Sequence, residues 1–231
     1  MNTIGLAIHG GAGTILKSEM SDELEDRYTN SLTTALSNGY KTLEDGGSAI
    51  DAVEITVTTL ENDPLFNAGK GSVFNNQGKH EMDASIMDGK TLNAGAVCCV
   101  EDFKNPIQLA RLVMDKTDHV MLTGKGAMIF GNEMKCEKAD KEYFFDEFRY
   151  KQWNSIKDSD SFQLDHSQKK DPKKFGTVGA VAKDKNGNLA AATSTGGMTN
   201  KKYGRIGDSS IIGAGNYANN LTCAVSCTGS G

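Results

Sequence analysis

One segment of the sequence, residues 153–174, is far more polar than the chain on either side of it. Lysine, aspartate, serine and glutamine dominate this segment, and Pro172 lies near its end. Such a composition buries too little apolar surface to stabilise a fixed fold, so we expect a linker or disordered segment there. This segment limits the possible folds of the chain, because it separates a long N-terminal part from a shorter C-terminal part. The C-terminal part begins with a predicted strand.

Secondary-structure patterns occur on both sides of the polar segment. Apolar residues recur at helical spacing over residues 22–45, and Ser48 begins a second helix with Asp51 as a variant capping box. Pro106 begins a third helix, since proline favours the first helical position, and a short helix is predicted over residues 125–130. The segments with strand character are residues 4–8, 83–87, 94–100, 177–182, 189–194 and 222–227. This mixed order predicts an α/β or α+β domain in which helices pack on sheet.

The composition narrows the class of protein. With 38% hydrophobic and 24% charged residues, the chain is expected to be soluble and globular rather than disordered. A net charge of −5 gives no support to a nucleic-acid partner, because nucleic-acid-binding proteins usually carry a basic patch. No apolar stretch approaches the length that spans a bilayer, and the N-terminus lacks the features of a signal peptide. We therefore expect no membrane partner and a cytoplasmic location.

Motifs for metal or nucleotide binding are missing from the sequence. The four histidines are scattered and no CxxC or HExxH occurs, so a zinc site is not expected. The glycine clusters do not extend to G-x-G-x-x-G or to a Walker A motif. Residues 9–11 are similar to the oxyanion loop of esterases, but the absence of a G-x-S-x-G nucleophile elbow excludes that family. The five cysteines have no regular spacing and are expected to be buried reduced thiols.

A Gly–Thr pair stands at the junction between the polar segment and the next strand. Taken alone, Gly176-Thr177 is more simply explained as the start of an ordinary strand. Its position, however, suits self-cleavage, because the polar side can be released while the strand holds the new N-terminus. Cleavage would give Thr177 a free α-amine, whose reference pKa of about 7.7–8.0 lets it accept the hydroxyl proton near neutral pH. We therefore predict Thr177 as an N-terminal nucleophile and Gly176–Thr177 as the cleavage site.

Seven short blocks extend this interpretation along the chain. They are residues 9–13 (HGGAG), 64–71 (PLFNAGKG), 82–89 (MDASIMDG), 176–182 (GTVGAVA), 192–201 (ATSTGGMTNK), 204–209 (GRIGDS) and 226–231 (SCTGSG). In this order they resemble the plant-type L-asparaginase/isoaspartyl peptidase family of N-terminal-nucleophile hydrolases. The first three are similar to the family's α-subunit and the other four to the start of its β-subunit.

The resemblance implies an α+β fold, the four-layer αββα sandwich of these hydrolases, in one structural domain. Residues 1–176 would be the α-subunit portion, ending in a flexible linker at about 154–176, and residues 177–231 the start of the β-subunit. The two cleaved chains would stay associated as a homodimer of αβ units. The β portion is shorter than in the family, so we expect the sandwich to lack its C-terminal part. A truncated, inactive precursor or fragment therefore stays an alternative.

Catalytic roles follow from the resemblance. Thr195 matches the residue whose hydroxyl hydrogen-bonds the nucleophile Thr177. The Thr228 hydroxyl and the Gly229 amide match the oxyanion hole, in which the loss of one donor commonly costs about 10²–10³ in rate.

Substrate and cation contacts are implied in the same way. The Arg205 guanidinium suits bidentate capture of an α-carboxylate, and Asp208 would take the α-ammonium; without the resemblance, an Arg205–Asp208 surface ion pair is the simpler explanation. The other substrate-binding residues are Asn67, Ile206, Gly207, Thr228, Gly229, Ser230 and Gly231. No cofactor is required, although the loop that holds a structural sodium ion in the family is matched. Its backbone carbonyls are those of Leu60, Glu61, Asp63, Phe66, Ala68 and Lys70.

The expected activity is that of an amidohydrolase acting on small molecules, namely L-asparagine and β-aspartyl (isoaspartyl) dipeptides. Glycosylasparaginases are the alternative, because residues 177–179 and the spacing from Arg205 to Asp208 fit both groups. The block at residues 192–201 favours the plant-type branch.

Overall fold

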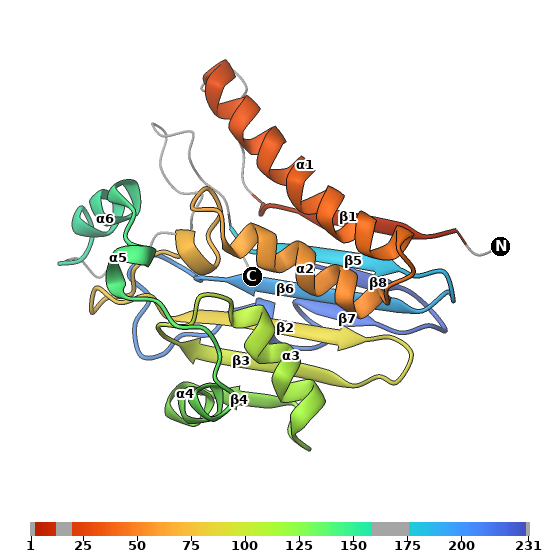
Figure 1. Cartoon of the computed structure of the whole chain (residues 1–231). Helices are drawn as coiled ribbons and strands as arrows, with labels where there is room; N and C mark the ends of the chain where they lie inside the picture. Colours follow the sequence, from red (N-terminus) through yellow and green to blue (C-terminus); the bar gives the residue numbers. More distant parts are fainter. Residues whose placement is uncertain (1–2, 13–19, 159–175, 230–231) are drawn as a thin grey trace.

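Three layers of secondary structure make up the computed structural model, which describes residues 3–12, 20–158 and 176–229. Helices cover one face of a six-stranded sheet, and a two-stranded sheet packs on the opposite face (Figure 1). The α+β class is therefore confirmed. A second layer of helices is not among the described residues, and none of their helices is long and apolar enough to cross a membrane.

Two long helices begin at serine residues that cap them. The Ser21 hydroxyl accepts a backbone N–H from the first turn of α1 (Asp22–Glu44). The Ser48 hydroxyl accepts the Asp51 N–H at the start of α2 (Ala49–Glu61). Each cap satisfies an N–H group that the helix itself leaves unpaired. Both predicted helices are confirmed.

Four shorter helices follow in the described chain. They are α3 (Pro106–Lys116), α4 (Gly124–Glu133), α5 (Lys141–Phe144) and α6 (Glu147–Asn154). Pro106 occupies the first turn of α3, as predicted, and α4 contains the predicted short helix. The helices α5 and α6 were not predicted. Their charged and aromatic residues do not form a continuous apolar stripe, so helical periodicity is weak there.

The six-stranded sheet interleaves the two parts of the chain. Its order is β1-β5-β6-β2-β3-β4, and all neighbouring strands are antiparallel except the parallel pair β3–β4. In sheet order the bounds are Gly5–His9, Val178–Lys183, Leu189–Thr195, Met82–Asp88, Ala94–Val100 and Met121–Thr123. Because β5 and β6 lie between β1 and β2, the chain that follows the polar segment forms the middle of the sheet. The two-stranded sheet consists of β7 (Asn216–Ala218) and β8 (Ala224–Ser226).

Side chains of the sheet alternate between two apolar cores. Along β6, Ala190 and Ala192 face the large core beneath the helices, whereas Ala191 faces the smaller core beneath β7 and β8. The large core contains the fully buried Val53 of α2 and Leu109 of α3. Each such side chain contributes about 1.5–3 kcal/mol through burial, so this core fixes the sheet that carries the site.

Two sequence expectations need correction. The expected linker begins too early, because Trp153 and Asn154 form the last turn of α6; residues 159–175 lie outside the described chain. The five cysteines are free, but only Cys98 is buried and Cys223 is exposed. The predicted strands are confirmed to within about two residues at each end, which is the usual uncertainty of strand and helix boundaries. The three-residue strands β4 and β7 were not predicted.

Candidate functional site

The predicted nucleophile lies at the beginning of a central strand. Thr177 immediately precedes β5, is 8% exposed, and has β1 and β6 on either side of its strand. Its hydroxyl is 2.7 Å from the hydroxyl of Ser209. Val178 pairs with Ser194 in the β5–β6 ladder, so continuation of this register places Thr177 beside Thr195. The site therefore forms where β5 begins and β6 ends.

The glycine loop after β1 lies directly against the predicted cleavage site. Gly11 has a φ of +120°, and a Cβ atom on it would lie only 2.4 Å from the Gly176 backbone nitrogen. Any residue other than glycine would displace Gly176. The loop at residues 9–11, which is similar to an esterase oxyanion loop, therefore packs closely against the Gly176–Thr177 peptide.

A histidine and a serine meet beside the nucleophile strand. His9 Nε2 is 2.8 Å from the Ser226 hydroxyl, which donates to the Ala192 carbonyl at 3.2 Å. Gly179 makes this pairing possible, because a Cβ atom there would lie 2.0 Å from Ser226 Oγ. Burial lowers the pKa of His9, although a contact with the Thr177 backbone opposes the shift. The ring is therefore neutral near pH 7 and joins β1 to β8 across β5.

The predicted oxyanion residue Thr228 follows β8. Its hydroxyl is buried and has no hydrogen-bond partner among the described residues. A Cβ atom on Gly176 would lie 3.5 Å from this hydroxyl, which places Thr228 next to the scissile peptide. An unused buried donor is costly unless it binds something, so its placement suits an oxyanion. The predicted substrate-binding residues Ser230 and Gly231 lie outside the described chain.

Thr195 and Asn67 organise the turn that follows β6. The Thr195 hydroxyl accepts the Gly197 N–H at 3.0 Å, and the Asn67 amide donates to the Gly197 carbonyl at 2.8 Å. The Asn67 side-chain oxygen accepts the Val73 N–H at 3.0 Å, so this 1%-exposed amide is satisfied on both sides. The hydroxyl partner of Thr177 is Ser209, while the Thr195 hydroxyl is engaged with the turn. Sequence reasoning assigned no role to Ser209.

The two predicted charged substrate ligands follow on the same segment. Arg205 and Asp208 are both partly exposed, and Asp208 begins the short helix η3 (Asp208–Ser210). No ion pair joins Arg205 to Asp208 in the described part of the chain, so the surface ion-pair alternative is not realised. Ile206 between them is 39% exposed. Both charged groups are accordingly available for a ligand that carries both signs of charge.

A buried ion pair holds this segment against β2. Lys201 Nζ donates to the Glu81 carbonyl at 2.6 Å and lies 3.9 Å from Asp83 Oδ2, with both side chains only 1% exposed. Burial raises the pKa of Asp83, and the nearby Lys201 charge opposes the shift. Asp83 also accepts the Cys99 N–H at 2.8 Å and pairs with Thr195 across the β2–β6 ladder. The pair therefore anchors the end of β6 to the sheet.

The loop predicted to hold sodium connects α2 to the short helix η2 (Gly69–Gly71). The loop folds back on itself, since a Cβ atom on Gly69 would lie 2.4 Å from the Glu61 carbonyl oxygen. The carbonyls of Leu60, Asp63 and Ala68 each accept one backbone N–H, at 3.2, 3.4 and 3.2 Å. A carbonyl oxygen has two lone pairs, so these groups keep capacity for a hard cation, which prefers oxygen ligands.

A carboxyl group beneath this loop is completely buried. Glu61 accepts hydrogen bonds from the Ser194 hydroxyl at 2.6 Å and from the Ile107 N–H at 3.0 Å. Its other oxygen accepts the Asn105 amide at 3.1 Å. Burial raises the pKa of Glu61 to about 8, with the three hydrogen bonds opposing the shift. The side chain joins the end of α2 to the start of α3 and to β6, one residue before Thr195.

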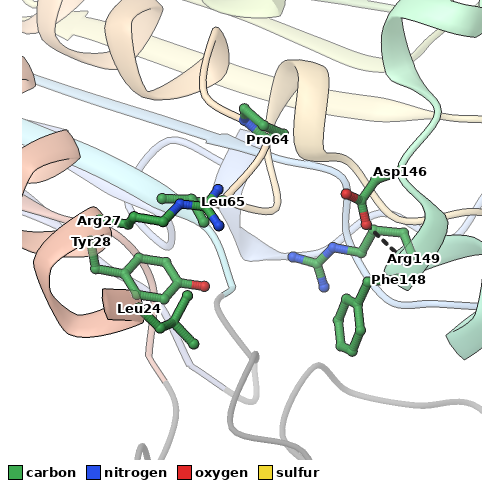
Figure 2. Close-up of a pocket in the computed structure, with 8 residues that line it drawn as sticks. All are labelled: Leu24, Arg27, Tyr28, Pro64, Leu65, Asp146, Phe148 and Arg149. Carbon is green, nitrogen blue, oxygen red and sulfur yellow. Dashed lines mark hydrogen bonds between the residues drawn. The ribbon is translucent and has the colours of Figure 1, made fainter. Parts of the chain in front are cut away.

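A separate pocket of about 90 Å³ lies between α1, residues 64–65 and α6. Figure 2 shows the guanidinium groups of Arg27 and Arg149 extending toward it from opposite sides. Asp146 accepts the Arg149 backbone N–H at 2.9 Å as the cap of α6. None of the predicted site residues lines this pocket, so the candidate site is the cluster around Thr177.

Comparison with known proteins identifies the family to which the chain belongs. A sequence model of the family described as "Asparaginase" matches residues 1–231. The "Isoaspartyl peptidase" of Salmonella typhimurium is 50% identical over 233 residues, which cover 100% of this chain and 74% of that protein. The "Isoaspartyl peptidase" of Escherichia coli is 51% identical, with 98% of this chain and 71% of that protein covered. The "Isoaspartyl peptidase/L-asparaginase" of Homo sapiens is 49% identical, with 100% and 72% covered.

Proposed function

Because the chain belongs to the asparaginase family, we propose that it is an amidohydrolase that cleaves L-asparagine and β-aspartyl (isoaspartyl) dipeptides. The observation that carries this proposal is the convergence at Thr177. Its buried hydroxyl follows Gly176, which lies against the Thr228 hydroxyl, and that hydroxyl has no hydrogen-bond partner among the described residues. Arg205 and Asp208 follow on one segment, and no ion pair joins the two within the described chain. A nucleophile, an oxyanion donor and two opposite charges are the groups that hydrolysis of such a substrate requires.

The first step is self-cleavage between Gly176 and Thr177. The released α-amine of Thr177 is then the base that accepts the proton of the neighbouring hydroxyl. The hydroxyl oxygen attacks the side-chain amide carbonyl of the substrate, and the amine or ammonia leaves after it is protonated. Water then hydrolyses the acyl-enzyme ester and regenerates Thr177.

Thr228 and Gly229 stabilise the charge that develops in this reaction. The Thr228 hydroxyl is buried and unpaired in the described chain, so it donates to the oxyanion without first breaking another hydrogen bond. A donor that needs no reorganisation contributes most at the transition state.

Arg205 and Asp208 select the substrate class. Asparagine and β-aspartyl dipeptides both present a free α-carboxylate and an α-ammonium beside the reacting carbonyl. The guanidinium of Arg205 binds the first and the carboxylate of Asp208 binds the second. Both substrates place these groups identically, so the site accepts either one.

The proposal also includes a sodium site, a cytoplasmic location and a dimeric assembly, which the family resemblance implies. The backbone carbonyls of residues 60–70 named above would hold a sodium ion, which would fix the loop that carries Asn67. By resemblance, the enzyme acts in the cytoplasm as a homodimer of αβ units. Calorimetric titration with sodium tests the cation site, and light scattering of the purified protein tests the homodimer.

The test of the activity is a hydrolysis assay on asparagine and a β-aspartyl dipeptide. We expect Thr177→Ala to abolish both activities, because no other hydroxyl takes its place on β5. Thr177→Ser keeps the oxygen and is the control, with part of the activity retained. Hydrolysis by the alanine variant at the rate of the unaltered protein would contradict the proposal.

A further inference from the structure

Self-cleavage poses a problem that the mature enzyme does not have. Before the Gly176–Thr177 bond breaks, the Thr177 nitrogen belongs to a peptide bond and cannot act as a base. Some other group must therefore receive the hydroxyl proton when Thr177 attacks the Gly176 carbonyl. The identity of this group matters only if the chain cleaves itself, as the proposed function requires.

The structure gives the Thr177 hydroxyl one hydrogen-bonding side chain among the described residues. Ser209 Oγ is 2.7 Å away, and beyond it Asp208 Oδ1 is 3.5 Å from Ser209 Oγ. An ionised carboxylate only accepts hydrogen bonds, so the single proton of Ser209 points toward Asp208. Ser209 must then accept from Thr177. This direction is the one that prepares Thr177 to lose its proton.

We propose that Ser209 passes the Thr177 proton to Asp208 during self-cleavage. Thr177 Oγ1 bonds to the Gly176 carbonyl carbon, its proton moves to Ser209 Oγ, and the Ser209 proton moves to Asp208. The Gly176–Thr177 C–N bond then breaks as the leaving nitrogen takes a proton from Ser209 Oγ, and Ser209 regains its own proton from Asp208. The resulting ester between Gly176 and Thr177 Oγ1 is hydrolysed by water. Asp208 leaves the step ionised and free to bind the substrate ammonium.

Ser209 is held in place by its backbone, not by its side chain. Its carbonyl accepts the Ser85 hydroxyl at 2.6 Å and also the Thr193 hydroxyl. The Asn216 amide donates to the Ser85 carbonyl at 2.9 Å and contacts both hydroxyls. These bonds connect η3 to β2, β6 and β7, and they leave the Ser209 hydroxyl oxygen free to accept the hydrogen bond from Thr177. At 1% exposure, Ser209 is shielded from water that would compete for the proton.

The other ionisable groups around the site have different partners. His9 contacts the Thr177 backbone, but its Nε2 atom contacts the Ser226 hydroxyl. The buried Asp83 is held by Cys99 and faces Lys201, and Arg205 lies on the same segment as Asp208. None of these groups forms a hydrogen bond with the Thr177 hydroxyl in the described chain. The path through Ser209 is therefore the connected one.

The decisive experiment measures the rate of self-cleavage of the purified protein on a denaturing gel. We expect Ser209→Ala to slow the appearance of a fragment beginning at Thr177 by about 10²-fold, the lower end of what proton transfer contributes. The matched control is Ser210→Ala. Ser210 is equally buried and neighbours Ser209, but its hydroxyl contacts Cys98 at 3.3 Å. The Ser210→Ala variant is therefore expected to cleave itself at the rate of the unaltered protein.

A second variant separates proton transfer from packing. Asp208→Asn keeps a hydrogen-bond acceptor of the same shape but cannot take a proton, so it is expected to slow self-cleavage similarly. The self-cleavage rate is also measured in mixtures of H₂O and D₂O. For the unaltered protein, a plot of this rate against the deuterium fraction should be curved, because two protons move in the same step. For Ser209→Ala the plot should be a straight line. A merely structural role for Ser209 would not change this dependence.

The outcomes distinguish this proposal from the function on which it rests. Self-cleavage of both Ser209→Ala and Asp208→Asn at the unaltered rate would refute the relay and leave the proposed function intact. If Ser209→Ala does not fold, Asp208→Asn alone decides. Failure of the unaltered protein to release a fragment beginning at Thr177 would instead overturn the proposed function.

Discussion

Single residues around Thr177 have separable tasks, and their substitution should affect different steps. In the proposed function Arg205 binds the substrate carboxylate, and it has no contact with the scissile peptide among the described residues. Arg205→Ala should therefore leave self-cleavage unchanged while it raises KM for asparagine by about 10- to 100-fold, the value of a charge-assisted hydrogen bond of roughly 1.5–3 kcal/mol. Steady-state kinetics check this, with the exposed Arg27→Ala on α1 as control. An unchanged KM would remove Arg205 from the carboxylate role.

Gly11 belongs to the step before catalysis. A Cβ atom on Gly11 would collide with the Gly176 nitrogen at 2.4 Å, and its φ of +120° disfavours any side chain. Gly11→Ala should slow self-cleavage by at least tenfold, because a small displacement of the scissile peptide already disturbs the attack geometry.

The control for Gly11 is Gly46→Ala. Gly46 has a φ of +92° but open space around it, so its substitution introduces backbone strain without a collision. A denaturing gel over time compares the two variants. If both cleave equally fast, the packing of Gly11 against Gly176 has no catalytic consequence.

The site residues that could be predicted from the sequence lie in short local motifs, whereas those that were missed depend on contacts between distant parts of the chain. Arg205, Asp208 and Thr228 stand in short blocks that can be recognised without knowing their partners. Ser209 lies in one of these blocks, but its contact with Thr177 spans 32 positions. The His9–Ser226 contact spans 217 positions, so it exists only once the sheet has assembled.

The secondary-structure elements also differ in whether local sequence signals are enough to predict them. The helix α1 has a serine cap and an apolar stripe of its own, and α3 has Pro106 in its first turn, so local signals suffice for both. The strands β4 and β7 are only three residues long, too short for a visible alternation. They exist because the parallel partner β3 and the hairpin partner β8 supply their hydrogen bonds.

The junction of α2, α3 and β6 should make stability depend on pH through Glu61. Its pKa is raised from 4.5 to about 8 by burial, so the folded protein binds a proton more tightly than the unfolded chain does. The corresponding stability is fully present below pH 4.5 and is lost as pH rises through about 8. Glu61→Gln cannot ionise and should flatten the decline over this window.

Thermal unfolding at several pH values measures this effect. Glu133→Gln on the exposed face of α4 is the control and should keep the pH dependence of the unaltered protein. A Glu61→Gln profile that falls as steeply as the control would show that Glu61 does not change its ionisation on folding.

At the scale of the whole molecule, the order of strands decides what cleavage can do. The strands β5 and β6 lie between β1 and β2, with antiparallel partners on both sides. Breaking the chain at Gly176–Thr177 therefore removes one covalent bond but none of the interstrand hydrogen bonds. The two fragments should stay together in native buffer and separate only under denaturing conditions. This interleaving is also what buries Thr177 and shields it while its peptide bond is intact.

Under the proposed function, Thr177 becomes the N-terminal residue of a new chain. The most direct test is intact mass with N-terminal sequencing of the purified protein after prolonged incubation, run under denaturing conditions. We predict two fragments, the second of which begins Thr177-Val178-Gly179. A single uncut chain, or a second fragment that begins at any other residue, would show that Thr177 is not an N-terminal nucleophile.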